Sequence, residues 1–73
     1  MASLKVHRSS EDNTIIGSVP ENRVPQFVKD LQENGTLWGA YLKDDSSMVL
    51  VKDKFDEVHE TTLFMSTDGY LFE

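Results

Sequence analysis

Cysteine is absent from this chain of 73 residues. A chain without thiols has no disulfide framework, no thiolate zinc site and no cysteine nucleophile. Long apolar runs are missing as well, because no stretch approaches the roughly 18 residues that cross a membrane and no apolar signal segment follows Met1. Internal repeats and low-complexity tracts are also absent. We therefore expect a soluble, cytoplasmic, single compact domain over residues 1–73, with no linker and no second domain.

Basic residues are few: seven Lys and Arg stand against thirteen Asp and Glu, and the formal net charge is −6. The excess lies in residues 44–73, which carry eight acids and two lysines, whereas residues 1–43 carry five acids and five bases. An acidic field repels nucleic acid and anionic membranes and attracts basic protein surfaces. We expect a protein partner with a basic surface, and no direct binding to nucleic acid or membrane. The plainer interpretation is that these charges keep a small domain soluble.

One helix is predicted over residues 23–34. Its apolar residues repeat at the spacing of one helical face, at Val24, Phe27, Val28 and Leu31. Pro25 fits only the first turn, so the start is expected near Asn22 or Arg23, with Asn22 as the cap. Asn34-Gly35 is expected to end the helix, because glycine accepts the left-handed conformation found there.

Strands are expected on both sides of this helix. Leu4–His7 alternates between apolar and polar residues, and Thr14–Gly17 is expected to pair with it as a hairpin. Residues 36–52 contain two apolar runs around a polar loop, which predicts a second hairpin. Residues 61–72 surround Asp68-Gly69, a strong turn signal, and predict a third hairpin.

The predicted fold is therefore a small α+β domain with the order β-β-α-β-β-β-β. An antiparallel sheet of about five or six short strands is expected to carry the helix on one face. Residues 53–60 fit two descriptions, either one helical turn or a turn that leads into a long strand.

The 36–52 hairpin bears most directly on binding. Neither of its runs alternates cleanly between apolar and polar residues, so both of its faces are expected to be covered. One helix covers one face only, and the other requires a second layer, a curled sheet or a partner molecule. We expect Trp38 and Tyr41 to point to opposite faces, with Gly39 marking a bulge or a close backbone approach.

Motifs for catalysis, cofactors and metals are lacking. His7 and His59 lie on different elements, and His59-Glu60 has no second histidine four residues on. The acids between residues 53 and 60 would gather a hard cation only in a helix. The four glycines are scattered and form no phosphate-binding loop. We expect no catalytic residue, no cofactor and no metal, and predict that the protein is not an enzyme.

The sequence thus favours a small acidic, non-catalytic protein-binding module, that is, a regulator, adaptor or inhibitor. It is expected to dock its partner through an apolar sheet face with an acidic rim, as many interfaces do. The predicted contact residues are Trp38, Tyr41, Leu42, Asp44, Asp45, Met48, Asp53, Asp56 and Glu57.

Two other functions stay open. In the first, the acidic row imitates nucleic-acid phosphates and occupies the basic cleft of a DNA- or RNA-handling protein. In the second, the sheet face is buried by self-association, for example in a homodimer, and the domain is structural.

Overall fold

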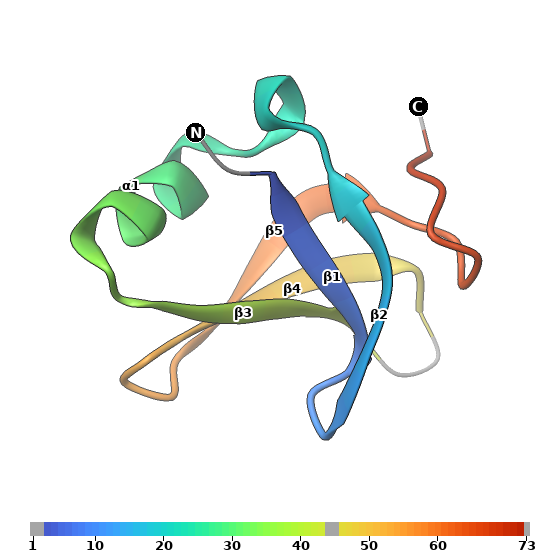
Figure 1. Cartoon of the computed structure of the whole chain (residues 1–73), viewed down its shortest axis with the longest axis horizontal. Helices are drawn as coiled ribbons and strands as arrows, with labels where there is room; N and C mark the ends of the chain where they lie inside the picture. Colours follow the sequence, from blue (N-terminus) through green and yellow to red (C-terminus); the bar gives the residue numbers. More distant parts are fainter. Residues whose placement is uncertain (1–2, 44–45, 73) are drawn as a thin grey trace.

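The computed structural model describes residues 3–43 and 46–72. Its strands form one five-stranded sheet in the order β2-β1-β3-β4-β5 (Figure 1). A 3-10 turn, η1 (Glu21–Arg23), and one helix, α1 (Gln26–Asn34), lie between β2 and β3 along the chain. The predicted α+β class and order of elements are confirmed. The strands are β1 (Leu4–Ser9), β2 (Asp12–Val19), β3 (Leu37–Leu42), β4 (Met48–Asp53) and β5 (Val58–Phe64).

The sheet is mixed, which corrects the expectation of a purely antiparallel sheet. β1 and β3 pair in parallel through Val6–Ala40 and His7–Tyr41, while the other three neighbouring pairs are antiparallel. β2 ends where β1 begins, since Val19 lies opposite Leu4. The connection through α1 then brings the chain back on the other side of β1, so that β3 runs in the same direction as β1.

Helix α1 begins at Gln26, later than the predicted start. Its N-cap is Pro25, which is extended at φ −60° and ψ 151°, and Val24 is extended too, with ψ 126°. The ring of a proline disfavours the helical conformation for the preceding residue, so the helix cannot run through Val24. Asn22, the predicted cap, lies in η1 instead.

The predicted end of the helix is confirmed. Gly35 adopts the left-handed conformation at φ 70°, and the Thr36 N–H donates to the Leu31 carbonyl (3.0 Å). This bond satisfies one of the carbonyls that a helix end leaves without an intrahelical partner.

The core lies between α1 and one face of the sheet, here called the inner face. Alternate residues of the strands point into it, together with Val28 of α1. Burial of aliphatic side chains of this kind is the main force that holds the helix on the sheet. The buried cluster comprises Leu4, Val6, Val19, Val24, Val28, Ala40, Leu42, Val49, Val51, Leu63 and Met65.

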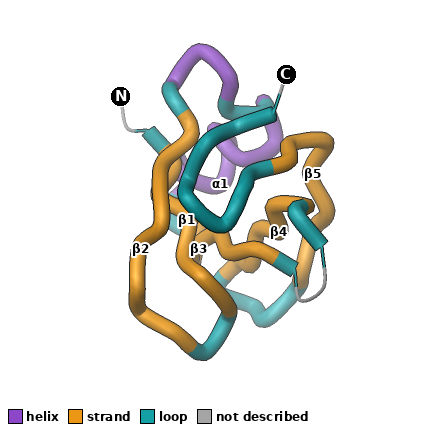
Figure 2. Tube along the Cα trace, turned by 90° about the vertical axis from the view of Figure 1, so that its right-hand side faces the viewer, coloured by secondary structure: helices purple, strands orange, loops and turns teal. Residues whose placement is uncertain are grey.

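The C-terminal segment folds back after β5. Gly69 has φ 91°, as a turn at Asp68-Gly69 requires, but the expected strand over 70–72 is reduced to one bridge between Met65 and Leu71. Figure 2 shows this segment as a loop between β2 and β5. Its Gly69 backbone lies against Gly17 of β2 so closely that a Cβ on Gly17 would lie 2.6 Å from the Gly69 oxygen. The two edges of the curled sheet are thereby brought together at one end.

Residues 54–57 form a turn, and β5 begins at Val58. The structure therefore selects the second description of residues 53–60, a turn that leads into a long strand. Within the described ranges, neither α1 nor η1 has the length and apolar character needed to cross a membrane.

Candidate functional site

The face of the sheet that points away from α1, here called the outer face, carries several large apolar side chains. The strand register places Tyr41 beside Leu50 and Met48 beside Phe64. Side chains alternate between the two faces of a strand, and the neighbours of these residues, such as Ala40, lie in the core. The apolar residues of the outer face are Trp38, Tyr41, Met48, Leu50, Val58 and Phe64.

No second layer covers this face within the part of the chain that the structure describes. Trp38 is 50% exposed, Val58 49% and Phe64 41%, whereas Leu50 in the middle is almost buried by its neighbours. The expectation that helix α1 would cover one face only is thus met, and the opposite face is left with large apolar groups in contact with solvent.

A β-bulge places Trp38 on the outer face. Leu37 lies opposite Asp53 and Gly39 opposite Lys52, so Trp38 is an extra residue in β3. An extra residue interrupts the alternation of side chains, and Trp38 therefore joins Tyr41 on the same face. The prediction of opposite faces was wrong. Of the two alternatives expected at Gly39, the structure shows the bulge, formed by the neighbouring Trp38.

The Trp38 ring rests against two polar side chains. The Lys52 ammonium lies 5.3 Å from the ring centroid, and the His7 ring lies 6.4 Å away, tilted by 37°. Lys52 also forms a 2.8 Å ion pair with Asp56. In this ion pair the Lys52 ammonium donates a hydrogen bond to Asp56, and that hydrogen bond raises the pKa of Lys52 above its ordinary value. Partial burial of Lys52 acts in the opposite direction and is outweighed. Contacts from Lys52 and His7 thus hold the indole in place on the sheet.

Two of the predicted contact residues do not lie on the outer face. Leu42 is 5% exposed and packs in the core, because it alternates with Tyr41 along β3. Asp53 is also 5% exposed and alternates with Lys52, so it points to the inner face rather than to an acidic rim. Asp56 and Glu57 are exposed in the β4–β5 turn, as expected. Asp44 and Asp45 lie outside the described residues.

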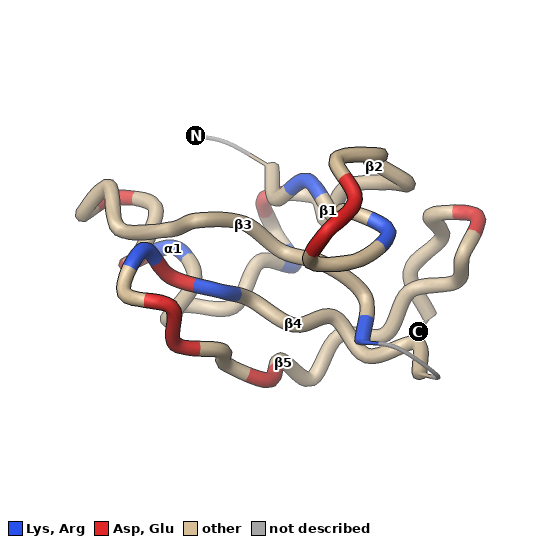
Figure 3. The backbone as a smooth tube through the Cα atoms, turned by 90° about the horizontal axis from the view of Figure 1, so that it is seen from below, with Lys and Arg blue, Asp and Glu red and all other residues tan. Residues whose placement is uncertain are grey.

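The acids that border the outer face come from the β4–β5 turn and from β5. Asp56, Glu57 and Glu60 are all exposed, and Figure 3 shows the acidic positions following one another along this edge. We call these three residues the acidic rim. Glu60 lies beside Leu50 in the register and forms a long ion pair of 3.9 Å with Lys43. Asp56, which pairs with Lys52, and Glu60 therefore lie beside the apolar residues of the outer face.

Buried Asp53 organises the β4–β5 turn. Its Oδ1 accepts hydrogen bonds from the N–H groups of Phe55 (2.9 Å) and Glu57 (3.0 Å), and its own N–H donates to the Glu57 carbonyl (3.0 Å). A side chain that accepts from the backbone two and four residues ahead fixes the course of a tight turn. Asp56, within this turn, has a positive φ of 72°.

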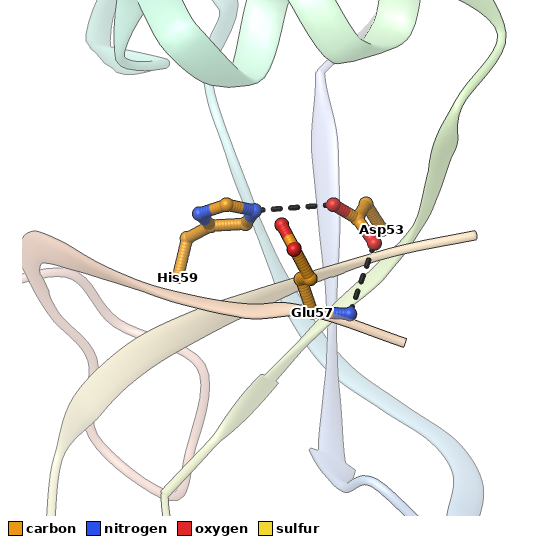
Figure 4. Close-up of side chains that lie close together, drawn as sticks. All are labelled: Asp53, Glu57 and His59. Carbon is orange, nitrogen blue, oxygen red and sulfur yellow. Dashed lines mark hydrogen bonds and ion pairs between the residues drawn. The ribbon is translucent and has the colours of Figure 1, made fainter. Parts of the chain in front are cut away.

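The second oxygen of Asp53 faces His59. Figure 4 shows the His59 ring and the Glu57 carboxylate directed toward Asp53, and the His59 Nε2 lies 3.2 Å from Asp53 Oδ2. The ring of Phe27 on α1 lies 5.8 Å from the His59 ring. One ligating atom from each of Asp53, Glu57 and His59 lies within 4.8 Å of the others. We call these three residues the Asp53 cluster.

The ionisation of Asp53 follows from these contacts. Burial alone would raise the pKa of its carboxyl, but hydrogen bonds from the Glu57 N–H, His59 and the Phe55 N–H outweigh burial and hold the pKa below its usual value of 3.8. Asp53 is therefore a carboxylate at neutral pH.

Sequence reasoning did not predict the Asp53 cluster. Its three residues occupy positions i, i+4 and i+6, which would share one face of an unbroken strand, but residues 54–57 form a turn and Glu57 is not part of a strand. A turn of four residues after Asp53 brings them together. The sequence feature that could have indicated this cluster is Asp53 at the end of an apolar strand, followed by His59 near the start of the next strand.

No family model matches the sequence, and comparisons with curated proteins and with solved structures found no match. The function must therefore be argued from the surfaces of the chain itself.

Proposed function

We propose that this protein is a small non-catalytic binding module that docks a partner protein through the outer face. The observation that carries the proposal is the half-exposed state of Trp38, Val58 and Phe64 on the same face of the sheet. Large apolar groups gathered on one face are typical of protein interaction sites, and Trp is enriched among the residues that dominate binding energy. A regulator, adaptor or inhibitor in the cytoplasm would use such a face.

The state of Trp38 before binding supports this role. Its ring is held by Lys52 and His7, and its backbone is held by the bulge beside Gly39. A side chain that is already ordered loses little conformational entropy when a partner covers it. Trp38 is therefore the expected anchor of the interface.

The acidic rim defines the chemistry of the partner. Asp56, Glu57 and Glu60 border the apolar surface, and the chain carries a net charge of −6. We expect the partner to present an apolar contact area surrounded by Lys and Arg. Charges at a rim mainly speed association and select the partner, while the apolar centre supplies most of the affinity.

The proposed contact uses the face of the sheet rather than the free edge of β5. Between Met48–Phe64 and Leu50–Glu60 the register shifts, so β5 is irregular at Thr61. The buried Thr61 hydroxyl donates to the Val49 carbonyl (2.6 Å) and accepts from the Leu63 N–H (3.1 Å). Irregular edges of this kind disfavour the addition of another strand.

The first test compares two exposed aromatic residues. Full-length protein is used to capture its partner from the source cells, and the purified partner is then titrated against Trp38→Ala and Tyr70→Ala. Tyr70 is 75% exposed and lies in the segment after β5, outside the set of residues that defines the outer face. Trp38→Ala should weaken binding by about 2 kcal/mol or more, roughly 30-fold, and Tyr70→Ala should leave it unchanged. Equal effects of the two variants would contradict the proposal.

Fluorescence provides a direct readout, because Trp38 is the single tryptophan of the chain. Its emission should shift to shorter wavelength when the partner covers the ring. The same shift could instead appear when the concentration of this protein alone is raised, together with a molecular mass above the 8.3 kDa of one chain. That result would show that a second copy of the chain, rather than a different protein, covers Trp38.

Charge reversal tests the rim separately. Asp56→Lys with Glu57→Lys should slow association with a basic partner, and the effect should shrink at high salt. Glu11→Lys, in the β1–β2 turn, changes the charge in the same direction and serves as the control. If the rim variant lost binding while Trp38→Ala bound as tightly as the wild type, the result would favour the alternative in which the acidic residues imitate nucleic-acid phosphates.

A further inference from the structure

We propose that the Asp53 cluster is a binding site for a zinc ion. The cluster combines one imidazole nitrogen with two carboxylates, and their ligating atoms lie within 4.8 Å of one another. It lies on the inner-face side of the sheet beside Phe27 and shares only Glu57 with the acidic rim. The proposal does not depend on the partner-binding function.

The distance between the two innermost atoms fits a shared ion. Zinc is held at about 2.0–2.2 Å by nitrogen and oxygen ligands in tetrahedral geometry, which places two ligand atoms about 3.3 Å apart. His59 Nε2 and Asp53 Oδ2 are 3.2 Å apart. The two atoms already occupy neighbouring ligand positions, and the ion would replace the proton that they share in the hydrogen bond.

The support around Asp53 resembles that of a metal ligand. Its Oδ1 is engaged by the N–H groups of Phe55 and Glu57, so the carboxylate cannot rotate and Oδ2 stays directed at His59. Hydrogen bonds to the outer atoms of ligands orient them and strengthen metal binding. Asp53 is buried, and little conformational freedom remains to be lost when an ion binds.

Glu57 completes the site from the exposed side. Its backbone is fixed by the hydrogen bonds to Asp53, while its exposed side chain lies next to His59 and is directed toward Asp53. Three protein ligands leave a fourth position to water, and the two carboxylates neutralise the charge of a divalent ion. The ring of Phe27 lies near the His59 ring, at 5.8 Å between the centroids.

The donor set selects the class of ion. Imidazole with carboxylates suits zinc and similar transition metals, whereas calcium requires six to eight oxygen ligands and magnesium keeps most of its water. We therefore expect zinc to bind and calcium to be rejected.

Calorimetry with zinc chloride tests the site. The full-length chain is freed of metal with a chelator, dialysed and titrated at pH 7 with zinc, and then with calcium. We expect one zinc ion per chain and no heat of binding with calcium. His59→Gln should weaken zinc binding at least 10-fold, and Glu57→Gln should weaken it as well. Asp56→Asn removes a neighbouring acid of the same turn and should leave the affinity unchanged.

Two checks keep the result decisive. Circular dichroism must show that each variant is folded, and Asp53 is left intact because it organises the turn. The imidazole NMR signals of His59 should shift at one equivalent of zinc, while those of His7 should not. Absence of binding by the wild-type chain up to 1 mM zinc, or equal affinity in wild type and His59→Gln, would overturn the proposal. A matching response to zinc and calcium would identify adventitious binding to surface acids and would overturn it too.

Discussion

Gly17 of β2 and Gly69 of the C-terminal turn lie backbone against backbone. A Cβ added to Gly17 would lie 2.6 Å from the Gly69 oxygen, and a Cβ added to Gly69 would collide with the Ile16 carbonyl. Through this contact the segment after β5 lies against β2, and its Leu71 pairs with Met65, which is fully buried. Two segments about fifty residues apart along the chain can thus pack closely only because neither glycine has a side chain.

Gly17→Ala should therefore destabilise the fold. The added methyl meets backbone atoms that cannot move aside as a flexible side chain does, and overpacking of this kind costs about 1–3 kcal/mol. Gly39→Ala is the matched control, because a Cβ there would meet the nearest atom, in the His7 ring, at 3.9 Å, an ordinary contact. The measurement is urea unfolding followed by circular dichroism. Equal stability of the two variants would show that the Gly17–Gly69 contact is not tight in solution.

Met65→Ala tests whether the C-terminal segment is part of the core. Met65 is fully buried in the same cluster as Val6 and Val49, and its truncation should cost about 2–5 kcal/mol. Tyr70→Ala, at an exposed position of the same segment, should stay within about 0.5 kcal/mol of wild type. Equilibrium unfolding of both variants measures the difference. A small effect of Met65→Ala would mean that the segment after β5 is detached from the core.

Thr61→Val should be destabilising although valine has nearly the same shape. The substitution leaves the Val49 carbonyl and the Leu63 N–H without the hydroxyl that now serves both, at a cost of about 1–3 kcal/mol. Thr61→Ser keeps the hydroxyl and should be the less harmful change. Unfolding midpoints and hydrogen exchange of the Leu63 amide distinguish them. If Thr61→Val proved less destabilising than Thr61→Ser, the hydroxyl would not be the group that stabilises the irregular part of β5 at Thr61.

Acid should remove the contribution of Asp53 to stability. Because the folded-state pKa of Asp53 lies below its usual value of 3.8, the contribution is complete above that value and is lost as the pH falls through the folded-state pKa. Asp53→Asn cannot ionise and should show a weaker loss of stability between about pH 5 and pH 2. Urea unfolding across this range, with a chelator present, compares the two proteins. Parallel curves would show that the ionisation of Asp53 is not linked to folding.

The hairpin over residues 36–52 and the end of α1 could be predicted because their causes are local. Gly35 adopts the left-handed conformation directly after the helix, and Gly39 marks a bulge within its own strand. Such features depend on neighbours a few residues away, which a pattern of residue types records. The late start of α1 has a local cause as well, because Val24 precedes a proline and is thereby disfavoured in the helical conformation. The predicted start near Asn22 or Arg23 did not take this restriction into account.

The candidate site required the register between strands. Trp38 faces the same side as Tyr41 because β3 and β4 are paired with one extra residue in β3. Gly39 indicates a bulge or a close backbone approach, but it does not show which residue is the extra one. Asp53 was expected at a surface rim because it is charged. Its burial becomes acceptable once the turn supplies two N–H donors and β5 supplies His59.

The sequence by itself determined the α+β class, the order of the elements, the acidic second half and the presence of an apolar hairpin with one face to spare. These properties follow from local patterns and from composition. The tertiary structure alone decided the parallel pairing of β1 with β3, the membership of the outer face, the meeting of Gly17 with Gly69 and the assembly of the Asp53 cluster. Each of these depends on which segments pair and in which register, and that choice is made by packing the whole core at once.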